Sequence, residues 1–448
     1  MRYLPNTEQE RQAMLASLGI QTTEELFKDI PEEVKLKETP DIPHPLSELE
    51  VKVHMQKLAQ KNRSLNELVS FLGGGFYDHY IPSAVNYIIS RGEFLTAYTP
   101  YQAEISQGTL QSIYEFQTMI AQLTGMDIAN ASMYDGATAL AEAALMAAAH
   151  GRKRNNIVVS SAVNPLYLQV LSSYLRGRAD LEIRYIPVRN GITGTSDFEQ
   201  VIDENTAAVL LQQPNFFGCL EQGADIAEIA HKHGAKLVVC ADPISLGILS
   251  APGDYGADIV VGEGQSLGNA PYFGGPGLGF FAAREEFLRS MPGRIVGATV
   301  DTQGKRGFTL TLQTREQHIR REKATSNICS NQALNALAAS IYMALMGKQG
   351  LAETAELCLQ KAHYAEEKIS SLPGYSRAFP APFLKEFTVK CPVPAAKVVE
   401  RLLDRGFLAG IDLGKYYPNM KDYLLVAVTE KRTKEEIDCF AEQLEGIK

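Results

Sequence analysis

Short apolar runs rich in valine and isoleucine recur between residues 156 and 284, and they restrict the fold more than any other feature. The runs are NIVVSS, LEIRYIP, AAVLLQQPN, KLVVCADP, DIVVGEG and LGFFAAR. Segments with helical periodicity, at 165–178 and 223–234, lie between some of them. Apolar strands that alternate with helices form a mostly parallel sheet that helices cover on both faces. The sequence therefore predicts an α/β fold.

Several of these runs end in polar residues. In a mostly parallel sheet, ligands bind beyond the carboxyl ends of the strands. The residues just past those ends are Asn164, Asn215, Asp242 and the run from Glu263 to Gln265. We therefore expect a ligand site where these residues meet. The glycines near this site are not spaced as in dinucleotide or P-loop motifs, so nucleotide binding has little support.

Asp242 ends one apolar run, and the next run leads into a polar loop. Many pyridoxal-phosphate (PLP) enzymes place an Asp against the pyridine nitrogen in this way and carry the Schiff-base lysine on the loop. Here no lysine occurs from Leu237 through Gly304, and Gln265 stands near the expected position. Because a glutamine cannot form a Schiff base, we expect no covalently bound PLP on this chain.

A turn from Ser132 to Thr138 precedes an alanine-rich helix that ends near residue 150. The free backbone N–H groups and the dipole of such a helix can bind an anion. The alternative is plain capping of the helix by Asp135 or Thr138. The sequence leaves both open.

Two further stretches are candidates for binding. Residues 71–110 are dense in glycine, tyrosine and proline, which is typical of a binding loop or of a long packed loop. A basic run from Arg315 to Lys323 forms either a phosphate or interface contact or a solvated charged face. Thr325, Ser326 and Asn327 then predict the N-cap of a helix that begins at Ile328.

The formal net charge of -9 argues against nucleic acid or an anionic membrane as the main partner. No apolar run is long enough to span a bilayer, and the N-terminus lacks an apolar signal core. The six cysteines are scattered without a CxxC pair, so we expect reduced thiols, a cytoplasmic protein and no metal site.

The chain divides into three expected parts. Residues 1–70 are predicted to form a helical arm that packs on the main domain or on a second subunit. Residues 71–345 are predicted to form a large domain around the parallel sheet. Residues 346–448 alternate helices with two apolar runs, which predicts a small C-terminal α/β domain.

Several segments resemble one known family. They are YTPYQAEISQG (98–108), FQTM (116–119), LTGMDIANAS with DGATA (123–139), PGRIVG (292–297) and QTREQHIRREKATSNIC (313–329). The chain is similar to the glycine decarboxylase P-protein of the glycine cleavage system, and specifically to its N-terminal half, which in many bacteria is a separate alpha-type subunit. The likeness runs from about Leu72 to the C-terminus. It implies the fold-type I PLP transferase fold, in agreement with the predicted sheet.

The resemblance also implies a reaction and its partners. Such an enzyme decarboxylates glycine with PLP and passes the aminomethyl group to the lipoyl arm of the H-protein. The catalytic half carries a His-Lys pair in the loop and a His-Pro pair, whereas this chain has Gln265 near the lysine position and Asn164-Pro165 at the other. The family therefore implies a PLP-bearing partner, subunit 2, a dimer of heterodimers, and a chain that is inactive alone.

The resemblance marks candidate site residues. A wall of the active site or a channel for the lipoyl arm would use Tyr98, Thr99, Tyr101, Gln102 and Glu104. Contacts to a carboxylate, a phosphate or the H-protein would use Arg315, His318, Arg320, Arg321, Thr325, Ser326 and Asn327. A vestigial cofactor pocket would contain Asp135, Thr138, Asn164, Asp242 and Gln265.

Three alternatives remain open at this point. The two marked segments could only stabilise the contact between subunits. The whole chain could be a scaffold that organises its partner or docks the H-protein. It could also be a self-sufficient PLP enzyme that uses another lysine, such as Lys305 or Lys323.

Overall fold

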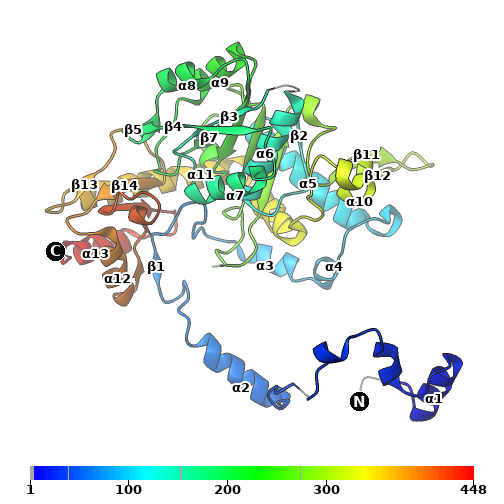
Figure 1. Cartoon of the computed structure of the whole chain (residues 1–448). Helices are drawn as coiled ribbons and strands as arrows, with labels where there is room; N and C mark the ends of the chain where they lie inside the picture. Colours follow the sequence, from blue (N-terminus) through cyan, green and yellow to red (C-terminus); the bar gives the residue numbers. More distant parts are fainter. Residues whose placement is uncertain (1–4, 39, 152–153, 273, 448) are drawn as a thin grey trace. The chain divides into compact units, whose positions relative to one another are not determined.

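The computed structural model describes residues 5–38, 40–151, 154–272 and 274–447. The chain divides into two compact units, Met1–Arg63 and Ser64–Lys448 (Figure 1). Among the described residues, no helix is both long enough and apolar enough to cross a bilayer.

The first unit consists of short helices. They are α1 (Glu8–Ser17), α2 (Glu48–Ala59) and two 3-10 turns (Thr23–Phe27 and Glu32–Val34). Thr7 caps α1 and Ser47 caps α2, each in a capping box with the glutamate three residues later. Residues 8–17 and 48–59 of the expected arm are thus helical, and the arm's bounds and packing stay predictions.

The first unit leaves most of its apolar side chains exposed. Leu15 is the one buried residue among those described in this unit, and α2 buries none. Exposed large apolar residues include Met14, Leu18, Leu26, Phe27, Ile30, Val34, Leu36, Ile42, Leu46, Leu49, Val51, Val53, Met55 and Leu58. Apolar surface on this scale is typical of a segment that binds another protein surface.

The second unit is built on a seven-stranded sheet in the order β2-β10-β9-β8-β7-β3-β4. The strands are β2 (Ile128–Ala129), β3 (Asn156–Ser160), β4 (Glu182–Ile186), β7 (Thr206–Gln213), β8 (Lys236–Ala241), β9 (Ile259–Glu263) and β10 (Gly279–Ala283). The strands from β9 to β4 are parallel, and β10 is antiparallel to both of its neighbours. The predicted α/β fold with a mostly parallel sheet is confirmed.

Helices cover both faces of this sheet. One face carries α6 (Gly136–His150) and α7 (Pro165–Leu175), which lie together in Figure 1, and the other carries α5 (Gln107–Thr124), α8 (Thr195–Val201), α9 (Gly223–Lys232) and the start of α11 (Ala333–Ser370). Successive strand residues face opposite layers: Val209 of β7 packs with the second group and Leu210 with the first. Burial on both faces explains why the strands are continuously apolar.

A smaller lobe lies at the C-terminal end of the chain. Its antiparallel sheet has the order β13-β14-β17-β16, with β13 (Ser376–Arg377), β14 (Glu386–Lys390), β16 (Ile411–Asp412) and β17 (Tyr423–Ala427). The helices α12 (Ala395–Asp404) and α13 (Lys434–Glu445) and the end of α11 pack on it. β1 (Val69–Ser70) pairs with β15 (Phe407–Leu408), so the start of the second unit is attached to this lobe. The domain boundary at residue 345 stays a prediction.

Apart from several 3-10 turns, the remaining helices and strands are short. They are α3 (Ser83–Ile89), α4 (Gly92–Leu95), α10 (Gln317–Arg320), the β5–β6 hairpin (Val188–Arg189 and Ile192–Thr193) and the β11–β12 hairpin (Ile295–Val300 and Arg306–Thr311). The β11–β12 hairpin packs on α5.

The helix predicted to begin at Ile328 was placed wrongly. It begins at Ala333, as α11. The preceding residues are held in a non-helical conformation by the turn that leads into α6. Asn331 Nδ2 donates to Ala131 O and Ser132 Oγ, and the backbone N–H of Gln332 also donates to Ser132 Oγ. These tertiary hydrogen bonds override the local capping signal.

Candidate functional site

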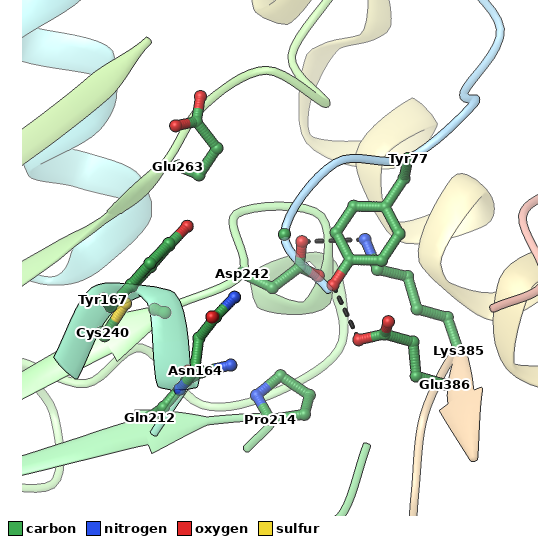
Figure 2. Close-up of a pocket in the computed structure, with 12 residues that line it drawn as sticks. Tyr77, Asn164, Tyr167, Gln212, Pro214, Cys240, Asp242, Glu263, Lys385 and Glu386 are labelled. Carbon is green, nitrogen blue, oxygen red and sulfur yellow. Dashed lines mark hydrogen bonds and ion pairs between the residues drawn. The ribbon is translucent and has the colours of Figure 1, made fainter. Parts of the chain in front are cut away.

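A small pocket lies at the carboxyl ends of β7, β8 and β9, and we call it the strand-end pocket (Figure 2). The start of α7, the loop after β1 and β14 of the small lobe complete its walls. The lining residues are Gly75, Tyr77, Asn164, Tyr167, Gln212, Pro214, Cys240, Ala241, Asp242, Glu263, Lys385 and Glu386. The cavity they leave has a volume of about 30 Å³. At the strand ends where the sequence predicted a ligand site, the structure therefore has a small cavity.

Asp242 forms a buried ion pair in this pocket. Its Oδ1 lies 2.8 Å from Nζ of Lys385, and its Oδ2 accepts from the backbone N–H of Ser245 at 2.9 Å. The Lys385 side chain is only 2% exposed. Its ammonium also lies 3.6 Å from the centre of the Tyr77 ring, in a cation–π contact. Asp242, which the sequence assigned to a vestigial cofactor pocket, is thus neutralised by a lysine of the small lobe.

The ion pair continues into a chain of buried polar groups. Lys385 Nζ lies 3.3 Å from His79 Nε2, and His79 Nδ1 lies 2.6 Å from Glu430 Oε2. Although burial opposes it, His79 and the backbone N–H of Tyr80 lower the pKa of Glu430 to about 2. Cys358 Sγ lies 3.5 Å from the same carboxylate, so these groups could be metal ligands. The hydrogen-bonding groups of His79, Glu430 and Cys358 already have partners in one another and in Lys385.

Two carboxylates take up the N-terminus of α6. Asp135 caps the helix by accepting from the backbone N–H of Thr138 at 2.7 Å. Glu263 accepts from the backbone N–H groups of Gly136 at 3.0 Å, Leu278 at 2.7 Å and Gln265 at 3.1 Å. Burial raises the pKa of Glu263 to about 7, against the three N–H donors that favour its charged form. Asp135 caps the helix, as one interpretation predicts. The second carboxyl at this N-terminus, that of Glu263, belongs to the chain itself and takes the place of a bound anion.

Gln265 and Asn164 attach the loop after β1 to the sheet. Gln265 Oε1 accepts from the backbone N–H of Tyr77 at 2.9 Å, while its Nε2 donates to Asn269 O and Tyr77 O. Asn164 Oδ1 accepts from Leu166 N–H at the start of α7, and its Nδ2 donates to Gly74 O. Both amides therefore make structural hydrogen bonds through their oxygen and their nitrogen.

The residues around the strand-end pocket do not fit PLP. The acid for the pyridine nitrogen is paired with Lys385, and the anion site at α6 is filled by Glu263. Lys385 is a lysine inside the pocket, but it lies where the ring nitrogen would bind. The remaining volume of about 30 Å³ is enough for one or two water molecules.

A second cluster joins two segments that the sequence marked separately. We call Tyr101, Arg294, Glu316 and His318 the Arg294 cluster. The rings of Tyr101 and His318 are 6.4 Å apart, and Nη2 of Arg294 lies 3.3 Å from Tyr101 Oη. Glu316 Oε2 lies 3.9 Å from Arg294 Nε and 3.6 Å from His318 Nδ1. Arg294 is 6% exposed, and its Nε has no hydrogen-bond partner.

The other residues of the first segment lie at the surface. Tyr98, Gln102 and Glu104 are exposed, with 88% of Tyr98 accessible, and Thr99 is half-buried. They are therefore free to contact another molecule, as a wall or channel would require.

Arg315 has a different environment from the one expected. Its guanidinium donates to the backbone carbonyls of Leu312, Gly293 and Met291. These bonds hold the base of the β11–β12 hairpin and the turn that carries Arg294. The guanidinium is occupied by this chain, so it acts as a structural anchor.

The rest of the basic segment is mostly exposed. Arg320 and Arg321 are exposed, and Arg320 Nε donates to Thr314 O at 3.1 Å. Thr325 and Asn327 are also exposed, whereas Ser326 is half-buried and its Oγ accepts from Ile328 N–H. The exposed arginines remain available for an acidic partner.

Sequence reasoning missed Lys385 and Arg294. Lys385 lies 143 residues from Asp242 along the chain, and no local pattern connects the two. Tyr77 belongs to the glycine- and tyrosine-rich stretch that was singled out, although its role was not foreseen. Arg294 lies in the PGRIVG segment, which carried the resemblance but received no role.

The sheet, its helices and the small lobe together define the class of fold-type I PLP-dependent enzymes. Glutamate decarboxylase from Lactobacillus brevis CGMCC 1306 matches with a TM-score of 0.68 over 94% of this chain and 96% of its own, at 15% identity. A NifS-like protein matches with a TM-score of 0.63 at 14% identity, over 85% of this chain and 99% of its own. At such identities the likeness shows the fold alone.

Closer comparisons identify the family. The family described as the glycine cleavage system P-protein matches residues 1–444, and the chain belongs to it. Proteins described as "Probable glycine dehydrogenase (decarboxylating) subunit 1" from Desulforamulus reducens and Moorella thermoacetica are 55% and 54% identical over 447 residues, covering 100% of both chains. A crystal structure of glycine decarboxylase (P-protein), in inhibitor-bound form, has a TM-score of 0.90 and 43% identity, with 99% of each chain covered. The resemblance read from residues 313–329 and the other segments is confirmed.

Proposed function

We propose that this chain is the alpha subunit of glycine decarboxylase and works with a PLP-bearing partner, subunit 2. The assembled enzyme decarboxylates glycine and transfers the aminomethyl group to the lipoyl arm of the H-protein. Full-length similarity to proteins named subunit 1 supports the role. The observation that carries the division of labour is the strand-end pocket, where Glu263 and Lys385 leave no place for the cofactor.

The first unit supports a stable partner contact. It exposes large apolar side chains along α1, α2 and the segment between them. Because such surface is costly to leave in water, we propose that this unit binds the partner subunit. Two such pairs would make the dimer of heterodimers that the family implies.

The Arg294 cluster supports a contribution to the partner's active site. A buried guanidinium, whose Nε lies 3.9 Å from Glu316 without a hydrogen bond, lies beside an exposed loop of tyrosine, glutamine and glutamate. An arginine in this setting can bind a carboxylate, such as that of glycine, through charge-assisted hydrogen bonds. We propose that residues 98–104 and this cluster form the wall, and that the exposed Arg320 and Arg321 contact the H-protein.

Mixing experiments test the proposed function. The purified chain alone should be inactive in glycine–bicarbonate exchange and colourless, and it should gain activity when the partner subunit is added. A visible band that borohydride reduces, formed by this chain alone, would instead support a self-sufficient PLP enzyme.

The alternative is a scaffold that lines no site. The filled strand-end pocket is compatible with it. Full exchange activity after substitution of Tyr98 and Tyr101, in a complex that still assembles, would favour the scaffold over the wall.

A further inference from the structure

Three side chains of the strand-end pocket have the chemical character of three parts of a pyridoxyl phosphate. Glu263 is an acid at the N-terminus of a helix, Lys385 is a cation paired with Asp242, and Tyr77 is an aromatic ring that contacts Lys385 and donates a hydrogen bond to Glu386 (Figure 2). Glu263 lies in β9, Lys385 lies just before β14, and Tyr77 lies in the loop after β1, so the three are far apart in the sequence.

The acid occupies a site that is built for an anion. Gly136 and Leu278 donate backbone N–H groups to different oxygens of Glu263, and Gln265 adds a third. The N-terminus of α6 adds a positive dipole, the arrangement that binds phosphate groups in other proteins. Glu263 is 6% exposed, so solvent anions do not compete for these donors.

The cation and the ring occupy the other end of the pocket. Lys385 Nζ lies 2.8 Å from Asp242 Oδ1 and 3.6 Å from the centre of the Tyr77 ring. The Tyr77 hydroxyl donates to Glu386 Oε2 at 2.7 Å, which holds the ring in place. Asp242 therefore has the protonated nitrogen partner that a pyridinium would otherwise provide.

We propose that Glu263, Lys385 and Tyr77 act as a built-in substitute for the cofactor and exclude pyridoxyl phosphates from this subunit. The surfaces beneath them, Asp242 and the N-terminus of α6, remain able to bind such a ligand once the three side chains are removed. This inference deepens the proposed function, which gives the cofactor to the partner. Its test uses ligand binding by this chain, so its failure is separate from a failure of the assembled enzyme.

The direct test removes the three side chains. The full-length chain and its Tyr77→Ala/Glu263→Ala/Lys385→Ala variant are titrated with pyridoxamine 5′-phosphate by calorimetry. This probe has the ring and the phosphate but cannot form a Schiff base with a lysine. The native chain should show no saturable binding. The variant should bind the probe with a Kd at least about tenfold below the weakest Kd that the titration can detect. A matched control, Lys390→Ala, changes an exposed lysine at the far end of β14 and should behave as native.

A second probe separates the two ends of the pocket. Pyridoxamine lacks the phosphate, so Glu263→Ala should improve binding of the phosphorylated probe only. Lys385→Ala should improve binding of both probes, because it frees Asp242 for the ring nitrogen. Saturable binding by the native chain, or no binding by the folded triple variant, would overturn the proposal.

A test without substitutions covers the case in which the triple variant does not fold. The native chain is treated with PLP and borohydride, which converts an accessible lysine amine and the aldehyde into a secondary amine with loss of water. Peptide mapping should find Lys390 modified and Lys385 unmodified while the chain is folded. Modification of Lys385 at the rate of Lys390 would overturn the proposal.

Discussion

Lys385 and Asp242 show what a buried charge requires of its neighbours. The two side chains are 2% and 11% exposed, and each is the other's closest opposite charge. Taking both charges out of water is costly, so the pair adds little stability by itself, but removal of one partner leaves the other charge uncompensated. The same reasoning applies to Glu263, whose carboxylate depends on three backbone donors.

The ion pair can be measured with a double-mutant cycle. We expect Lys385→Met to lower the free energy of unfolding by about 3–5 kcal/mol, because Asp242 is left buried and unpaired. Lys385→Met with Asp242→Asn should recover part of this loss, since no charge remains. Urea denaturation gives the values, with the exposed Lys390→Met expected to change stability by less than about 0.5 kcal/mol. Equal losses for the two lysines would contradict the buried pair.

Glu386 gives the stability a dependence on pH. Burial raises the pKa of its carboxyl to about 7 from an ordinary value of 4.5. The folded chain thus holds this proton more tightly, and the resulting stability is complete below pH 4.5 and is lost as the pH rises through 7. We expect Glu386→Gln to reduce the fall in unfolding free energy between pH 5 and 8 by on the order of 2–3 kcal/mol.

Urea denaturation at a series of pH values measures this effect. The exposed Glu285→Gln serves as the control and should keep the native slope. A native slope in Glu386→Gln would show that this carboxyl does not titrate in the expected range.

At the level of elements, the β11–β12 hairpin and its flanking turn connect the two segments marked in the sequence. Arg315 binds three carbonyls at the base of the hairpin, and the turn it holds carries Arg294 toward Tyr101. The anchor and the candidate binding residue are therefore different arginines. A recognisable sequence segment can therefore contain residues that position a binding site as well as residues that bind the ligand.

Arg294 and Arg320 distinguish these roles. We expect Arg294→Ala to lower glycine–bicarbonate exchange of the assembled enzyme about tenfold or more, because a charge-assisted contact to a carboxylate is lost. Arg320→Ala, an exposed arginine of the same region, should stay within about twofold when exchange is measured without the H-protein, because Arg320 is proposed to contact that protein. Complex formation is checked by gel filtration. Native exchange by an assembled Arg294→Ala enzyme would exclude a catalytic contribution.

At the scale of the whole molecule, the two compact units differ in how they are stabilised. The second unit has continuous cores on both faces of its sheet and in the small lobe. The first has helices with good caps but a single buried side chain among its described residues. Capping boxes add about 1 kcal/mol each and cannot replace a core, so the first unit depends on another surface.

Helix α2 provides the test of that dependence. We expect Leu49→Asp with Val53→Asp, one turn apart, to weaken the complex with the partner subunit by tenfold or more, since each apolar side chain buried in an interface contributes about 1.5–3 kcal/mol. Lys52→Asp on the same helix is the control and should have a small effect. Sedimentation or gel filtration measures assembly. Unchanged assembly of the double variant would place the contact elsewhere.

Local sequence was sufficient for the sheet and for the absence of a Schiff-base lysine after Asp242. Apolar runs, turn residues and helical periodicity act over a few residues, so NIVVSS or KLVVCADP predicts a strand without knowledge of its neighbours. The start of α11 was missed because hydrogen bonds from the Ser132 turn, about 200 residues away, override its capping signal.

Only the tertiary structure decided what fills the pocket. Asp242 looked like one half of a cofactor site, and nothing near it in the sequence indicates that Lys385, 143 residues further on, neutralises it. Glu263 likewise lies 127 residues from Gly136, the first residue of α6, whose backbone N–H it accepts. Charges and donors act through space, so their partners are set by how the small lobe and the sheet pack together. That packing turned a recognisable cofactor motif into a site filled by the chain itself.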